Sequence, residues 1–103
     1  MAVAGATSLP ASASADERWT RALKIPEVLV DDTYTTAIIA DVDNPASCSV
    51  PSFLRIAKTE SNYESITATI LSAQAQGRTV RFFAAACYPD GSVHITGVWI
   101  QQQ

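Results

Sequence analysis

Short apolar runs separated by turn-forming residues fill most of the chain, and this pattern predicts a small β-rich domain. Five of the runs are rich in β-branched and aromatic residues, which favours strands. We expect these strands over residues 22–30, 34–40, 53–58, 79–85 and 92–100. The clearest turn signal is Tyr88-Pro89-Asp90-Gly91, where proline fixes φ and glycine accepts a positive φ. Other turns are expected at Asp31-Asp32 and Asp43-Asn44-Pro45.

The first and last runs carry features that restrict their place in a sheet. Pro26 cannot donate a ladder hydrogen bond, so the first strand is expected at an edge or at a bulge. In the last run, simple alternation places Val93, Ile95 and Trp99 on one face. The opposite face then carries His94, Thr96, Val98 and Ile100. Gly97 predicts a bulge or bend in this strand.

One helix is predicted between the third and fourth strands. Ser61 and Glu64 fit an S-x-x-E capping box, in which each side chain binds an otherwise unpaired backbone amide, and Gly77 provides the C-terminal stop. A stripe at helical spacing is expected to face the core, formed by Tyr63, Ile66, Ile70 and Ala73. Three strands, one helix and two strands are the element order of the OB fold. We therefore expect a mainly β protein, a small five-stranded OB-type barrel.

The far side of the predicted helix is small and uncharged, whereas a solvated helix face normally carries charged residues. It is formed by Ser65, Ala68, Thr69, Ser72, Ala75 and Gln76. Only 17% of all residues are charged, against roughly 25% in an average soluble domain. Both observations favour contact with a second copy of the chain, with Ser65, Ala68, Ser72 and Ala75 as the interface. The alternative is an ordinary exposed face rich in alanine and serine.

The two cysteines, Cys48 and Cys87, are far apart in the sequence, and there is only one histidine. This set does not supply the four closely spaced ligands of a structural zinc site. Two distant cysteines in a small domain suit one disulfide formed in an oxidising compartment. We therefore expect a Cys48–Cys87 disulfide and a secreted or periplasmic protein. The alternative is a pair of unrelated buried thiols in a cytosolic protein.

The start of the chain differs in composition from the remainder. Residues 1–15 are rich in alanine and serine, and Ala13-Ser14-Ala15 fits a signal-peptidase site, although a basic region and an apolar region are missing. We expect residues 1–18 to be a flexible arm or a signal-peptide remnant, and residues 19–103 to form one OB-like domain. No run of 18 apolar residues occurs, so no membrane span is expected.

The residues favour binding over catalysis. His94 is the only histidine and lies within a predicted strand, while the paired carboxylates flank turns, where aspartate is a common turn former. All four glycines are isolated, so no phosphate-binding loop is predicted. The seven lysines and arginines are scattered and the net charge is −3, which argues against a nucleic-acid partner. We expect no enzyme activity, no cofactor and no metal.

The segment SITATILSAQAQGRTVRFFAAACYPDGSVHITGVWI contains a helix ending in alanines and a glycine, a strand, a cysteine-containing turn and an aliphatic-aromatic final strand. It resembles the C-terminal half of exported bacterial B subunits of AB-type toxins, such as the subtilase cytotoxin and pertussis-like B subunits. The resemblance covers residues 61–100, and Cys48 lies where the partner cysteine is expected. It implies an OB-type barrel, a pentamer with helices around a central pore, host-glycan recognition and a possible A-subunit partner.

No sugar-contacting residue of that family matches this sequence, so the candidate site comes from its own aromatic residues near predicted loops. These are Tyr34, Tyr88 and Trp19, for which packing within turns is the alternative. Two other functions stay open. One is an exported structural or self-assembling protein without a glycan ligand, and the other is an inhibitor or immunity-type protein that plugs a partner.

Overall fold

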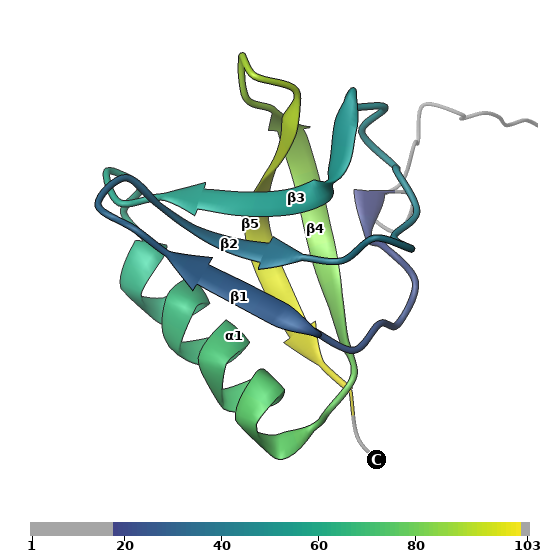
Figure 1. Ribbon diagram of the computed structural model, residues 1–103, viewed down its shortest axis with the longest axis vertical. Coiled ribbons are helices and arrows are strands. Elements are labelled where there is room, and N and C mark those ends of the chain that lie inside the picture. Colours follow the sequence, from purple (N-terminus) through teal and green to yellow (C-terminus); the bar gives the residue numbers. More distant parts are fainter. Residues whose placement is uncertain (1–17, 102–103) are drawn as a thin grey trace, which may run out of the picture.

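The computed structural model describes residues 18–101, and it is a five-stranded mixed sheet with one helix (Figure 1). The expected N-terminal arm or signal remnant, except for Arg18, falls outside the described residues. The elements are β1 Glu27–Val30, β2 Tyr34–Ile38, β3 Val50–Ala57, α1 Tyr63–Gln76, β4 Val80–Cys87 and β5 Ser92–Ile100. The mainly β class and a helix between the third and fourth strands are therefore confirmed.

The strands lie in the order β1-β2-β3-β5-β4, with β3 and β5 parallel and all other neighbours antiparallel. Pro26 lies just before β1, which is an edge strand as expected. The expected first strand over residues 22–30 is too long, because only residues 27–30 pair with β2. The preceding segment makes isolated bridges to β4 instead, Trp19 to Phe83 and Leu23 to Val80. The five strands form an open sheet rather than a closed one.

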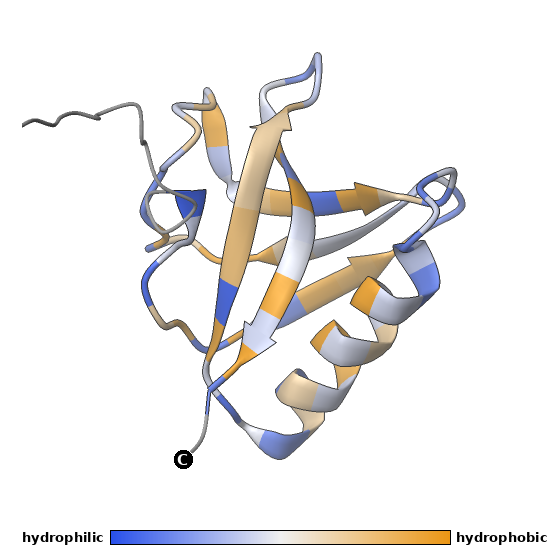
Figure 2. Cartoon of the chain, turned by 180° about the vertical axis from the view of Figure 1, so that it is seen from behind, coloured by the Kyte–Doolittle hydropathy of each residue, from blue (hydrophilic) through white to orange (hydrophobic). Residues whose placement is uncertain are grey.

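The helix lies against one face of the sheet and contacts β5, β3 and β1 (Figure 2). Its predicted core stripe is confirmed, because Ile66, Ile70 and Ala73 are buried and Tyr63 packs against the core. Gly77 ends the helix with a φ of 66°, a left-handed conformation that glycine adopts without strain. Fully buried strand residues, among them Leu54, Ile56, Phe82 and Ile95, complete the core.

A polar connection runs beneath the helix. Thr67 Oγ1 donates to Thr35 Oγ1 at 3.0 Å, and Thr35 Oγ1 donates to Tyr63 Oη at 2.9 Å. The hydroxyl of the fully buried Thr35 is therefore satisfied by two helix residues. Because neighbouring strand residues point to opposite faces, Tyr34 and Thr36 must point away from α1.

The final strand differs from the expected alternation. Phe83 pairs with Gly97 and Ala84 pairs with Ile95, so Thr96 is an extra residue that forms a bulge beside the glycine. A bulge or bend at this glycine was predicted, but its effect on side-chain direction was not. Val98 and Ile100 pack against the core, whereas Trp99 is 49% exposed. The placement of Trp99 on the face of Val93 and Ile95 was therefore wrong.

The start of the helix also differs from the expected capping box. The N-cap residue is Asn62, and no side chain makes a capping hydrogen bond there. A capping box needs a serine at the N-cap and a glutamate three positions later. Ser61 lies one position before the N-cap and Glu64 only two positions after it, so the reciprocal pair of bonds does not form. Asn62 Nδ2 instead donates to the carbonyl oxygen of Thr96 at 3.1 Å, which joins the helix start to β5.

This correction predicts the relative effects of two substitutions. Ser61→Ala should change the free energy of unfolding by less than about 0.5 kcal/mol, since the side chain is exposed and caps nothing. Asn62→Ala should cost about 0.5–1.5 kcal/mol, because it removes the bond to Thr96. Urea unfolding of both variants, followed by circular dichroism, measures the difference. A larger loss of unfolding free energy for Ser61→Ala than for Asn62→Ala would support the capping box and contradict the observed helix start.

The Cys48–Cys87 disulfide is confirmed, with 5.6 Å between the two Cα atoms and a sequence separation of 39. It joins the loop before β3 to the last residue of β4. Cys48 is buried within the core cluster, and Cys87 is exposed. Over residues 18–101, no helix has the length and apolar character needed to cross a membrane.

Candidate ligand-binding site

Two of the three aromatic residues predicted as site candidates come together. Tyr34 is the first residue of β2 and Tyr88 directly follows β4, yet their ring centroids lie 5.2 Å apart with the rings inclined at 67°. Both rings are partly exposed. The third candidate lies elsewhere, since Trp19 packs edge to face against Phe83 and Trp99 at 5.3 and 5.7 Å. The structure therefore separates Trp19 from the tyrosine pair.

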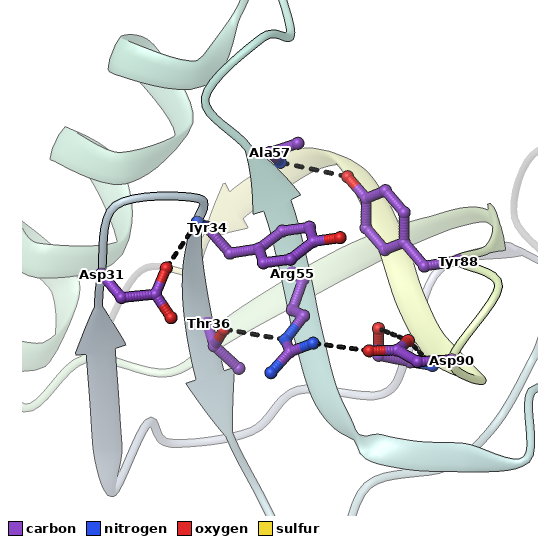
Figure 3. A network of polar contacts seen from close by, with 8 residues as sticks. Asp31, Tyr34, Thr36, Arg55, Ala57, Tyr88 and Asp90 are labelled. Carbon is purple, nitrogen blue, oxygen red and sulfur yellow. Dashed lines mark hydrogen bonds and ion pairs between the residues drawn. The ribbon is translucent and has the colours of Figure 1, made fainter.

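Arg55, which the sequence did not single out, joins the two sides of this site. Its guanidinium lies over the rings of Tyr34 and Phe53, at 4.8 and 5.2 Å from their centroids. Nε donates to Thr36 Oγ1 at 3.1 Å, and Nη1 donates to Asp90 Oδ2 at 2.7 Å (Figure 3). Arg55 and Thr36 are paired residues of β3 and β2, so their side chains share the sheet face that points away from α1.

Tyr88 also has a structural role at the end of β3. Its hydroxyl oxygen accepts a hydrogen bond from the backbone amide of Ala57 at 3.0 Å (Figure 3). The ring stacks on His94 with 4.7 Å between centroids and 26° between planes. Burial raises the pKa of Tyr88 above its ordinary value, so the phenol stays protonated at neutral pH. His94 Nε2 lies 3.4 Å from Glu60 Oε1 without forming a hydrogen bond.

Two turns border this pair of rings, and each is organised by an aspartate. Asp31 Oδ1 accepts from the amides of Tyr34 and Thr33 at 2.7 and 2.8 Å, and these bonds hold the pKa of Asp31 below its ordinary value. Asp90 Oδ1 accepts from the hydroxyl and amide of Ser92 at 2.6 and 2.9 Å. The Ser92 hydroxyl bond is the main reason that the pKa of Asp90 is lowered. Both carboxylates are ionised at neutral pH.

The turn between β4 and β5 is fixed against the loop before β3. Gly91 has a φ of 93°, which residues with a Cβ atom rarely adopt, and a Cβ atom there would also lie 2.0 Å from Ser49 Oγ, so a substitution would be strained. The amide of Val50 donates to the carbonyl oxygen of Gly91 at 2.9 Å. The disulfide to Cys48 holds Cys87, which directly precedes Tyr88. We call Asp31, Tyr34, Arg55, Tyr88 and Asp90 the tyrosine surface.

A hollow of about 480 Å³ lies away from the tyrosine surface, between the segment before β1 and the end of β2. Leu23, Pro26 and Ile39 line its apolar part, while Arg21 and Asp41, also at its wall, form an ion pair of 3.3 Å. None of the sequence-predicted site residues lines this hollow. It is open, and Arg21 and Asp41 at its wall are already paired with each other, so we assign it no role.

The small helix face is placed as the sequence predicted. Ser65, Ala68, Ser72 and Ala75 are all exposed, and they lie on the side of α1 opposite the buried stripe. Leu71 lies among them and is 43% exposed, which adds an apolar side chain to this face. Single exposed apolar residues are common, so the face alone does not show a contact.

The arrangement is suited to binding through rings and hydrogen bonds. Among the residues with described positions, no group of three or more histidine, cysteine, aspartate or glutamate side chains could hold a metal ion. The described contacts of the His94 side chain are with Tyr88 and Glu60. Aromatic rings and a guanidinium lie together beside β2 and β3, and ionised carboxylates in two turns border them (Figure 3).

Comparison of the chain with protein-family models, with curated proteins and with solved structures finds no match. The functional argument therefore depends on the geometry of the tyrosine surface and on the sequence resemblance to toxin B subunits.

Proposed function

We propose that this chain is an exported, non-catalytic, homo-oligomeric carbohydrate-binding protein that resembles a toxin B subunit and binds its glycan at the tyrosine surface. One observation carries the proposal. Tyr34 and Tyr88, 54 residues apart in the sequence, bring their rings into contact beside Arg55, Asp31 and Asp90. Binding sites for small ligands typically combine aromatic surface with a few well-placed polar groups.

The strand order supports an OB-type barrel of the partly open kind, although the five strands do not close into a barrel here. The order β1-β2-β3-β5-β4 has a parallel β3–β5 pair, and the segment leading into β1 bridges to β4 at Trp19 and Leu23. In this fold the face of strands 2 and 3, together with the 1–2 and 4–5 loops, binds oligosaccharides or oligonucleotides. Tyr34 and Arg55 lie on β2 and β3, while Asp31 and Asp90 lie in the two corresponding turns.

Charge favours a saccharide over an oligonucleotide. A protein that binds a phosphate backbone needs several unpaired basic side chains along the groove. The cation at the centre of the tyrosine surface, Arg55, already pairs with Asp90, and Asp31 adds a second carboxylate. A tyrosine ring can pack against the C–H face of a sugar ring, and carboxylates can accept hydrogen bonds from its hydroxyl groups.

Export and assembly complete the proposal. A disulfide in a small domain is typical of secreted and periplasmic proteins. The small, exposed helix face around Ala68 permits close approach of another helix, and the toxin-like segment favours a pentameric ring. A catalytic A subunit is a possible further partner of such a ring.

The test is a glycan array probed with the purified, oxidised protein and with two variants. Wild type should bind a defined set of glycans, and Tyr34→Ala should weaken binding about tenfold or more, as expected for a central aromatic contact. Trp99→Ala is the matched control, because it removes an exposed aromatic residue from a different cluster. If Tyr34→Ala binds glycans as tightly as wild type, the glycan site lies elsewhere. An oligomer that binds no glycan would support the exported self-assembling protein instead.

A further inference from the structure

We infer that the tyrosine surface selects uncharged saccharides and rejects glycans that end in a carboxylate or sulfate. This inference rests on the proposed carbohydrate-binding function and adds the chemical class of the ligand. It follows from the charges that surround the two tyrosine rings and from the partners that those charges already have.

Acidic side chains outnumber basic ones around the rings. The carboxylates are Asp31 and Asp32 in the first turn, Glu60 beside His94, and Asp90 in the second turn. The cations are Arg55 and Lys58. Among the aspartate, glutamate, arginine and lysine side chains named here, four negative charges stand against two positive ones, a difference of −2. A ligand anion that approaches this surface meets net repulsion.

The charge of the central cation is already balanced by a carboxylate. The Arg55 side chain is only 15% exposed, lies over two aromatic rings, and bonds to both Asp90 and Thr36. A ligand carboxylate that binds the remaining N–H groups of Arg55 would lie close to the Asp90 carboxylate and be repelled by it. Lys58, in the turn after β3, is exposed, as are Asp31, Asp32 and Asp90, so these carboxylates outnumber it.

The carboxylates that repel an anion are also good partners for an uncharged sugar. Their oxygens accept hydrogen bonds, and sugar hydroxyl groups donate them. Asp31 and Asp90 are held in place by bonds from backbone amides and from Ser92, so each has a fixed position at the border of the rings. Preorganised acceptors beside aromatic rings favour a polyhydroxylated, neutral ligand.

The experiment compares matched glycan pairs. Immobilised galactose-terminated glycans and their terminally sialylated or sulfated counterparts are titrated with the oxidised wild-type protein at low salt. The neutral member of each pair should bind at least about tenfold more tightly, and the difference should shrink at high salt as the charges are screened. Asp90→Asn should narrow the difference in affinity between neutral and acidic glycans, because it removes one negative charge and the ion pair of Arg55. Asp41→Asn, an exposed aspartate at the separate hollow, should leave it unchanged.

The outcomes separate the two proposals. Equal or tighter binding of the acidic glycans overturns the charge selection while leaving carbohydrate binding in place. A charge preference that responds to Asp41→Asn and not to Asp90→Asn places the selecting surface elsewhere and also overturns the inference. If the protein binds neither the neutral nor the acidic glycans, the carbohydrate-binding function itself is rejected, and the inference about the ligand class is rejected as well.

Discussion

Loss of the Cys48–Cys87 disulfide is expected to lower the free energy of unfolding by about 3–4 kcal/mol. The bond closes a loop across 39 positions and so restricts the unfolded chain. A domain of this size has a small stability margin, so the loss is a large part of its total stability. The double variant Cys48→Ala/Cys87→Ala removes the bond without leaving a reactive thiol.

Urea unfolding of the oxidised wild type, the reduced wild type and the double variant measures this contribution. Intact mass after alkylation without reduction confirms that the disulfide is present at the start. The double variant and the reduced protein should unfold at similar, lower urea concentrations. Midpoints equal to that of the oxidised protein would mean that the tight packing of Gly91 against Ser49 and Val50 holds this region without the disulfide.

Local patterns were sufficient to predict the order of the elements. The helix differs from the strands in apolar spacing, and turn residues separate consecutive elements. The order of the elements can therefore be inferred without tertiary contacts. The final strand was predicted with the bounds observed, Ser92–Ile100. The helix start was off by one position because a capping box fits Ser61 and Glu64 in sequence, whereas a contact with Thr96 of β5 holds Asn62 at the helix start.

The direction of Trp99 depends on two strands together. Thr96 is an extra residue on β5 and Ala85 is an extra residue on β4, and each shifts the register of the pair. Gly97 indicated a bulge or bend in β5, but the identity of the inserted residue and the second insertion at Ala85 cannot be inferred from β5 alone, because a bulge is a property of the paired strands. The same limit applies to the first strand, whose N-terminal part pairs with β4 rather than with β2.

The tyrosine surface was only partly predictable for a similar reason. Turn positions singled out Tyr34 and Tyr88, but their contact requires the parallel pairing of β3 with β5, which brings the two ends together. Arg55 has no sequence signal, since an isolated cation within a strand is common on any exposed face. Its role follows only from its register opposite Thr36 and from its bond to Asp90 in a distant turn.

Ala68→Arg is expected to convert the assembled protein to monomers while the fold of each chain is kept. The mass of wild type measured by light scattering should be that of an oligomer, and a pentamer would have about five times the 11.0 kDa mass of one chain. Ala68 is exposed on the small helix face, away from the buried Ile66 and Ile70, so the arginine should not disturb the core. Within a close helix contact, an unpaired arginine would be buried at high cost.

Multi-angle light scattering reports the mass, and far-ultraviolet circular dichroism reports the fold. Thr59→Arg is the matched control, because it adds the same charge at an exposed position in the turn before the helix. It should stay assembled, whereas Ala68→Arg should not. A monomeric wild type would reject assembly outright. An Ala68→Arg variant that keeps the wild-type mass would place the interface away from α1, for example at the free edge of β1, where Leu29 and Val30 are 45% and 49% exposed.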